Sequence, residues 1–139
     1  MILLDTSGLL AALFIDQRRH TECARALTET DGPLVFSPFV LAELDYLVAK
    51  LAGETVEREL LAEVARGAYQ LAEVDARDIE EARVVIENHD GLGIGLADAM
   101  TVVLSRRLGC LDLLTLDERH FRMLRGFKDR PFQVLPADG

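Results

Sequence analysis

Short apolar runs alternate with longer segments of helical periodicity along this chain, and the alternation restricts its fold more than any other feature. Apolar runs too short for a helix are typical of buried strands. They cover residues 2–4, 34–36, 113–114 and 132–135, and a weaker strand is expected at 69–73. Strands joined through helices pair in parallel, because the connection must cross over the sheet. We therefore expect an α/β fold, a three-layer α/β/α sandwich with a central parallel sheet.

Apolar residues spaced three and four apart predict six helices between these strands. The helices are expected at about 7–14, 20–29, 38–51, 54–67, 76–89 and 96–107, with a short further helix at 118–123. Turn residues agree with these bounds: Gly53 ends a helix, and the segment GLGIG at 91–95 breaks the chain without the GxGxxG spacing of a dinucleotide site. The chain has 139 residues, half of them apolar, so we expect one domain spanning 1–139.

Acidic residues outnumber basic residues by 24 to 15, which gives a formal net charge of −9. A field of this sign repels phosphate backbones at long range, so any contact with nucleic acid must be local. The two cysteines, Cys23 and Cys110, lack CxxC spacing and fit free thiols in a reducing compartment. No stretch approaches the roughly 20 apolar residues of a membrane span, and Asp5 stands where an export signal has a basic residue. We expect a cytoplasmic protein with no place in a membrane.

Two aspartates stand where a sheet of this kind binds ligands. In open α/β sheets, ligands bind beyond the carboxyl ends of the strands. Asp5 follows the first strand directly, and Asp117 follows the apolar run 111–116. An aspartate after a strand also commonly forms a turn or caps the next helix, so each position alone has a purely structural interpretation.

Two further acids fall on apolar helix faces. Glu43 lies three residues after Val40 on the stripe of the helix at 38–51, and Asp98 lies four residues after Ile94 on that of a later helix. Each is also consistent with an arginine partner or with a place at the domain edge. Because an unpaired buried carboxylate is costly, the four acids together favour a shared divalent cation, Mg²⁺ or Mn²⁺.

The same segments resemble the PIN-domain nucleases, in particular the toxins of VapBC toxin–antitoxin pairs. The family's four acidic motifs are similar, in order, to MILLDTSGLLA, SPFVLAELDYLV, GLADAMTVVLSRRLGC and LLTLDERHF. The trailing segment PFQVLPA is similar to the family's last strand, so the resemblance covers nearly the whole chain. It implies Mg²⁺- or Mn²⁺-dependent hydrolysis of RNA phosphodiester bonds by a metal-activated water. A toxin of this family would act as a homodimer and would bind a VapB-like antitoxin.

The resemblance implies an acidic pocket, and its residues are Asp5, Glu43, Asp98 and Asp117. We expect Asp5 and Asp98 to be the primary metal ligands. Glu43 would bind the metal directly or through water, and Asp117, where the family varies most, would complete the site or position a second ion. This chemistry needs no protein nucleophile, and no serine or cysteine has a nucleophile motif such as GxSxG.

Hydroxyl and basic side chains flank the acids. Hydroxyl groups expected to orient carboxylates or water belong to Thr6, Ser7 and Thr115. Basic residues expected to contact RNA phosphates are Arg119, Arg122 and Arg125. Hydroxyls beside turns also cap helices, and a basic run is also typical of a solvated surface. His120 follows Asp117 by three residues, a spacing that metal ligands use, but we expect it at the rim of the site.

Other classes of protein share parts of this pattern. A phosphoaspartate receiver has paired acids after its first strand and a lysine after its last, whereas here Asp5 stands alone and the segment Thr115-Leu116-Asp117 has no lysine. A haloacid-dehalogenase-type phosphatase needs a second aspartate at the position of Ser7. The sequence disfavours both classes. A non-catalytic scaffold or regulator-binding dimer is the stronger alternative, because apolar helix faces at 9–15 and 54–67 fit either a partner or the core. Acids at all four positions favour the nuclease, since a scaffold gains nothing from inward carboxylates.

Overall fold

The computed structural model describes residues 1–139, and its five strands form a single parallel sheet. The strands are β1 (Ile2–Leu4), β2 (Leu34–Phe36), β3 (Gln70–Leu71), β4 (Asp112–Leu114) and β5 (Gln133–Leu135), in the spatial order β3-β2-β1-β4-β5. The central strand is β1, in which Leu3 pairs with Val35 on one side and with Leu113 on the other. All the expected strands are present, and the weak one at 69–73 is reduced to two residues.

Seven α-helices connect the strands. They are α1 (Thr6–Leu13), α2 (His20–Glu29), α3 (Pro38–Ala52), α4 (Glu54–Ala65), α5 (Ala76–Asn88), α6 (Leu96–Leu108) and α7 (Glu118–Phe121), with a 3₁₀ turn η1 (Phe127–Asp129) before β5. Their ends agree with the predicted bounds to within one or two residues, because capping residues define them. Ser37 accepts the N–H of Val40 at the start of α3, and Gly53 ends that helix. No helix combines the length and apolar character that crossing a lipid bilayer requires.

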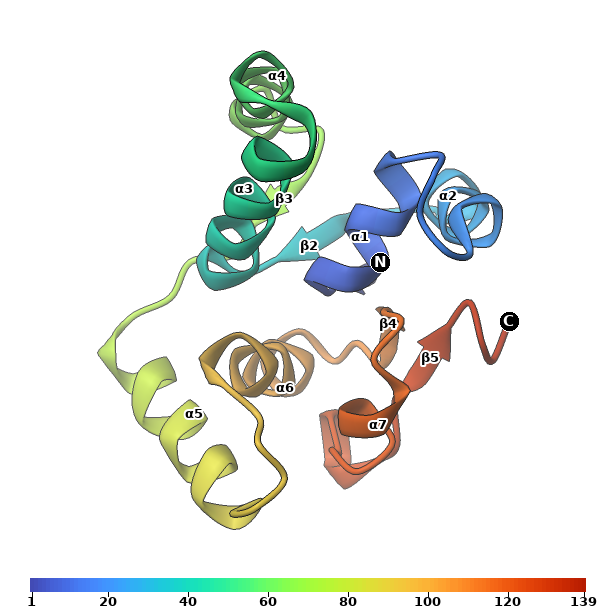
Figure 1. Cartoon of the computed structure of the whole chain (residues 1–139). Helices are drawn as coiled ribbons and strands as arrows, with labels where there is room; N and C mark the ends of the chain where they lie inside the picture. Colours follow the sequence, from blue (N-terminus) through green and yellow to red (C-terminus); the bar gives the residue numbers. More distant parts are fainter.

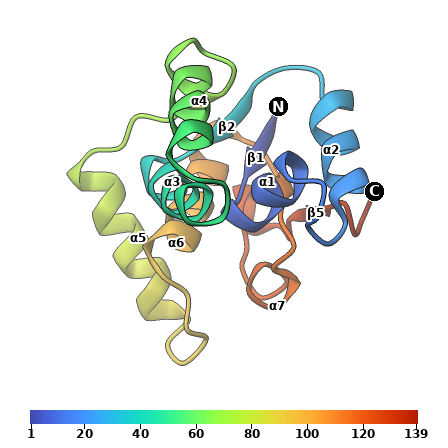
Figure 2. The same cartoon turned by 45° about the horizontal axis from the view of Figure 1, so that its top comes forward.

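Helices cover both faces of the sheet (Figures 1 and 2). Successive side chains of a strand point to opposite faces, and this alternation divides the core into two clusters. Ile2 and Leu4 of β1 pack with buried side chains of α1, α2, α3 and α4. Leu3 of the same strand packs with Val35, Leu113 and buried side chains of α5, α6 and α7. The predicted three-layer α/β/α sandwich is therefore confirmed.

The direction in which the chain winds reverses between β1 and β4. The crossovers from β1 lead to β2 and β3 on one side, whereas β4 lies on the other side of β1 and leads to β5. Such a reversal opens a crevice beyond the carboxyl ends of the two strands, where α/β proteins bind ligands. The N–H of Asp5 donates to the carbonyl of Leu114 at 3.0 Å, which places Asp5 at this point.

Helix α1 approaches the end of β4 so closely that only glycine fits at position 8. A Cβ added to Gly8 would lie 2.5 Å from the carbonyl oxygen of Leu114. The close approach holds the first turn of α1, with Thr6 and Ser7, beside the end of β4. Backbone packing thus brings together two segments that are distant in the sequence.

Replacing Gly8 with alanine should destabilise the protein. The methyl group must displace backbone, and we expect a loss of about 1–3 kcal/mol in the free energy of unfolding, despite the roughly 1 kcal/mol that alanine gains over glycine inside a helix. Urea denaturation measures the change. Gly95→Ala is the control, because a Cβ there meets nothing within 4 Å, and it should cost less than about 1 kcal/mol. Equal effects at both positions would contradict the role of the α1–β4 contact.

Candidate active site

Asp5 occupies the N-cap position of α1, is buried, and does not cap the helix. Its Oδ2 instead accepts hydrogen bonds from Ser7 Oγ at 2.9 Å and from Thr115 Oγ1 at 2.7 Å. Burial raises the pKa of Asp5, and the two hydroxyl groups oppose this rise because they stabilise the charged carboxylate. The helix-cap interpretation of Asp5 is therefore wrong, and its carboxylate belongs to the crevice between β1 and β4.

The hydroxyls of Ser7 and Thr115 tie Asp5 to the segment that follows β4. The N–H of Leu116 donates to Ser7 Oγ at 3.0 Å, and the N–H of Asp117 donates to Thr115 Oγ1 at 2.9 Å. Because each hydroxyl accepts from the backbone, its own hydrogen is directed to the Asp5 carboxylate. The hydrogen bonds expected from these two residues to a carboxylate are present.

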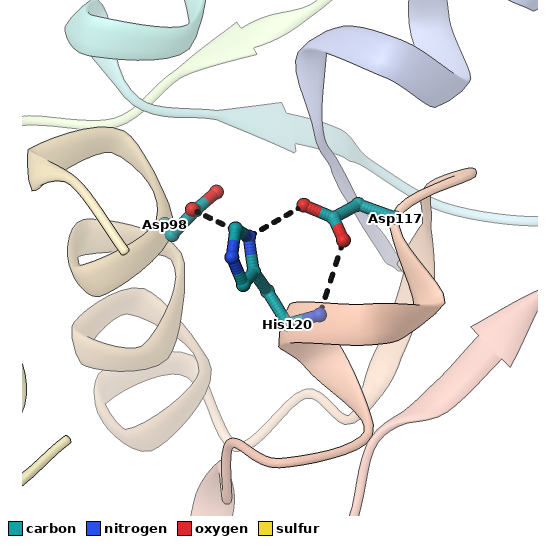
Figure 3. Close-up of side chains that lie close together, drawn as sticks. All are labelled: Asp98, Asp117 and His120. Atoms are coloured by element: carbon teal, nitrogen blue, oxygen red, sulfur yellow. Dashed lines mark hydrogen bonds and ion pairs between the residues drawn. The ribbon is translucent and has the colours of Figure 1, made fainter. Parts of the chain in front are cut away.

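Asp98, Asp117 and His120 converge from α6 and α7 (Figure 3). One ligand atom from each lies within 4.8 Å of the others. Asp98 stands in the first turn of α6, where the helix dipole favours a negative charge. Burial, together with the negative charges of Asp5 and Asp117, nevertheless raises its pKa to about 6, and His120 opposes this rise. These acids are therefore close enough to repel one another.

Asp117 caps α7 and belongs to the cluster at the same time. The backbone N–H of His120 donates to Asp117 Oδ1 at 3.1 Å, and its ring Nδ1 donates to Oδ2 at 2.8 Å. On the other side of the ring, Nε2 donates to the carbonyl of Leu92 at 3.1 Å. Both ring nitrogens of His120 therefore face acceptors, the Asp117 carboxylate on one side and the Leu92 carbonyl on the other.

The rim position predicted for His120 is wrong, since its half-buried ring lies inside the cluster, with Nδ1 3.6 Å from Asp98 Oδ2. The contact with Asp117 could have been predicted from the sequence, because a spacing of three residues places both side chains on one face of a helical turn. The sequence does not show that α6 brings Asp98 to the same point, 22 residues earlier in the chain.

Glu43 is exposed, so the prediction that it lies on the buried stripe of α3 is also wrong. The buried row of this helix consists of Val40, Leu44 and Val48. These residues follow one another at intervals of four, and the helical period turns Glu43 away from them. Its carboxylate still borders the site, because Thr6 Oγ1 donates to Glu43 Oε1 at 3.0 Å and its charge contributes to the raised pKa of Asp98.

The three arginines predicted to contact RNA differ in their surroundings. Arg122 forms ion pairs with Glu118 at 2.9 Å and with Asp138 at 2.7 Å, so its charge is already compensated. Arg119 and Arg125 are exposed and form no ion pair with a carboxylate. Arg119 lies in α7, two residues after Asp117, and its charge is free to act close to the cluster.

The donor set of the cluster fits a hard divalent cation. Asp5, Asp98 and Asp117 contribute carboxylate oxygens, and no lysine or arginine pairs with any of them. Mg²⁺ and Mn²⁺ bind such oxygens together with water. A cation would offset both the burial of the Asp98 carboxylate and the nearby charges of Asp5 and Asp117, which together raise its pKa. Glu43, at the exposed edge, adds a fourth carboxylate within electrostatic range.

Comparison with known proteins finds similar sequences. A family model described as PIN domain matches residues 2–125. Ribonuclease VapC26 of Mycobacterium tuberculosis (strain ATCC 25618 / H37Rv) is 40% identical over 135 residues, which are 97% of this chain and 100% of that protein.

Two solved structures share the fold. The crystal structure of Mycobacterium tuberculosis VapC20, described as a sarcin-ricin loop cleaving toxin, aligns with a TM-score of 0.77 at 22% identity, over 84% of this chain and 90% of that one. VapBC2 from Rickettsia felis, bound to a DNA fragment from the promoter, aligns with a TM-score of 0.66 at 19% identity, over 96% and 98% of the two chains. At these identities the two structures support the fold alone.

Removing the charge of Asp98 should stabilise the metal-free protein at neutral and alkaline pH. Its pKa is about 6 in the folded chain against a usual 3.8, so the folded state binds more protons than the unfolded state between these values. The free energy of unfolding therefore falls as the pH rises from about 4 to 6 and stays lowered above pH 6. Asp98→Asn avoids this loss, and we expect it to be more stable than the wild type by roughly 1–3 kcal/mol at pH 8, with little difference at pH 4.

Denaturation with urea in EDTA at pH 4, 6 and 8 measures this difference. Asp112→Asn is the control, because Asp112 is exposed at the start of β4, outside the cluster, and it should show no such pH-dependent gain. An Asp98→Asn protein less stable than the wild type at pH 8 would mean that the cluster is not electrostatically strained.

Proposed function

The chain belongs to the PIN-domain family as a homologue of the VapC ribonucleases, and on this premise we propose that it cleaves RNA at the cluster of Asp5, Asp98 and Asp117. The observation that carries the proposal is the convergence of these carboxylates without a lysine or arginine partner. They lie at the crevice between β1 and β4, in a chain 40% identical to a ribonuclease over nearly its whole length. The enzyme is accordingly a hydrolase that acts on phosphodiester bonds.

Asp5, Asp98 and Asp117 would hold Mg²⁺ or Mn²⁺, and Glu43 would bind it directly or through water at the exposed edge. Such a cation, when bound, neutralises charge on the phosphate and activates water for hydrolysis. Neighbouring hydroxyl groups orient two of the ligand carboxylates through hydrogen bonds. Ser7 and Thr115 direct their hydrogens to Asp5 Oδ2, so Oδ1 is left without a side-chain hydrogen bond. Thr6 holds Glu43 through its hydroxyl.

The proposed hydrolysis does not need a nucleophilic side chain. The hydroxyls that contact the proposed ligands, those of Thr6, Ser7 and Thr115, donate to carboxylates as fixed hydrogen-bond donors. None of them faces a histidine that could accept its proton, because both nitrogens of His120 are engaged elsewhere. This arrangement supports attack by water.

We further propose that the protein is the toxin of a type II toxin–antitoxin pair, silenced by a VapB-like antitoxin and active as a cytoplasmic homodimer. A mainly apolar cleft of about 240 Å³ between α1, α3 and α4 supports a protein partner, with Leu13, Val48 and Leu60 among its lining residues. The structural neighbour from Rickettsia felis is a VapBC assembly. Both cysteines are free thiols in the core, which suits a reducing compartment.

Cleavage of a mixed RNA pool by the purified, antitoxin-free chain tests the proposed activity. With Mg²⁺ or Mn²⁺ the wild type should cleave RNA, EDTA should abolish cleavage, and Asp98→Asn should lower the rate at least about 100-fold because a cation ligand is lost. Asp112→Asn should retain the wild-type rate. Equal rates for the wild type and Asp98→Asn, or cleavage that persists in EDTA, would rule out this cluster as the active site.

The free arginines should contribute to RNA binding more than Arg122 does. In an Asp98→Asn background, which leaves the RNA intact, Arg119→Ala and Arg125→Ala should each weaken binding and flatten the dependence of log K on log salt by about 0.7 for single-stranded RNA. Arg122→Ala should instead lower the melting temperature, because its ion pairs with Glu118 and Asp138 are lost. Fluorescence anisotropy in a salt series measures the slopes, and a slope change for Arg122→Ala as large as that for Arg119→Ala would contradict this distinction.

A further inference from the structure

His120 binds both oxygens of one proposed metal ligand. Its backbone N–H donates to Asp117 Oδ1 at 3.1 Å and its Nδ1 donates to Oδ2 at 2.8 Å, so the carboxylate is held at two points by a single residue (Figure 3). A carboxylate oxygen has two lone pairs, and each oxygen of Asp117 can accept a further ligand. The orientation of Asp117 is therefore set by His120 without its coordinating capacity being used up.

The far side of the same ring holds a second segment. Nε2 donates to the carbonyl of Leu92 at 3.1 Å, across 28 residues of sequence. Leu92 lies between Gly91 and Gly93, whose φ values are 85° and 78° and whose α-carbons have no neighbour that a side chain would meet. The side chains of Leu92 and Ile94 pack in the core, and the hydrogen bond from His120 is the contact that ties the backbone of this loop to the cluster.

The loop that His120 holds leads directly into the helix of another proposed ligand. Helix α6 begins at Leu96, and Asp98 stands in its first turn. The ring of His120 also lies beside Asp98, with Nδ1 3.6 Å from Asp98 Oδ2. His120 thus contacts the Asp117 carboxylate, the Asp98 carboxylate and the loop that precedes α6.

We propose that His120 is a positioning residue that sets the separation of Asp98 and Asp117 by binding the Asp117 carboxylate on one side and the Leu92 loop on the other. This inference rests on the proposed function, in which the two carboxylates hold a divalent cation. Ligand groups held at the right separation bind a cation more tightly, because they lose less conformational freedom on binding. Both hydrogen bonds of the ring should therefore contribute to the affinity for the metal.

Two substitutions separate the two hydrogen bonds. The amide nitrogen of asparagine occupies the position of histidine Nδ1, so His120→Asn keeps a donor for Asp117 and loses the contact with Leu92. The longer glutamine side chain places its amide nitrogen near the position of Nε2, so His120→Gln keeps a donor for Leu92 and loses the ring contact with Asp117. His20→Gln is the matched control, because His20 also binds a backbone carbonyl, that of Ala11 at 2.8 Å, but lies in α2 away from the cluster.

Calorimetric titration of the full chain with Mn²⁺ and amide hydrogen exchange of residues 90–95 in the metal-free protein are the two measurements. We expect His120→Asn and His120→Gln each to raise the Kd for Mn²⁺ by about 10-fold. Exchange of the loop should accelerate in His120→Asn alone, because only this variant releases Leu92. His20→Gln should change neither quantity.

Other results separate the failure of this inference from the failure of the proposed function. If the wild type binds Mn²⁺, Asp98→Asn does not, and both His120 variants bind within twofold of the wild type, the positioning role is overturned and the metal site stands. Unchanged loop exchange in His120→Asn also overturns it. If the wild type itself does not bind Mn²⁺, or binds it as Asp98→Asn does, the proposed metal site falls, and the positioning role falls with it.

Discussion

Repulsion between carboxylates is the interaction that this end of the molecule must balance. Asp5, Asp98 and Asp117 converge from three separate segments, and the pKa of Asp98 is raised first by burial and then by the negative charges of Asp5 and Asp117. Several modest contributions oppose the repulsion: two hydroxyl donors to Asp5, the N-terminal dipole of α6 at Asp98, and the imidazole of His120 at Asp117. Together they hold the acids in place and leave the pocket with a negative potential, which is the property that attracts a divalent cation.

The stability of the parallel sheet allows the protein to tolerate this repulsion. Its two faces bury separate apolar clusters, with Leu3 in one and its neighbours Ile2 and Leu4 in the other, so the strand that ends in Asp5 is anchored from both sides. Burial of large apolar side chains stabilises the domain far more than one strained crevice destabilises it. The site therefore contains residues that lower the stability of the fold, as is common where function and stability make different demands.

The elements of the fold could be predicted from the sequence because their signals are local. Strand runs, helical periodicity and caps such as Ser37 and Gly53 lie within a few residues of the boundaries they determine. The side-chain geometry of the site depends on contacts between distant segments. Glu43 was predicted to be buried because a stripe counted at intervals of three and four tolerates it, whereas the packed row of α3 follows intervals of four alone.

The wrong prediction of the position of His120 has a similar cause. Its partners Asp98 and Leu92 lie 22 and 28 residues away, on elements whose relative positions periodicity does not report. The ion pair of Arg122 with Asp138 likewise joins α7 to the end of the chain, so composition alone could not distinguish this arginine from Arg119. The proximity of Asp5 and Asp117 could be predicted, because residues that directly follow neighbouring parallel strands lie at the same edge of the sheet.

The order of the strands has a consequence for the time at which the pocket first exists. The hydroxyl of Thr115 that binds Asp5 comes 110 residues after it, and β5, which pairs with β4 beside Thr115, follows all the other strands of the sheet in the sequence. A ribosome that is still making this protein therefore carries a chain with its first acid exposed and without its partners. The carboxylate–hydroxyl contacts around Asp5 can therefore form only after the segment that carries Thr115 and β5 has been synthesised.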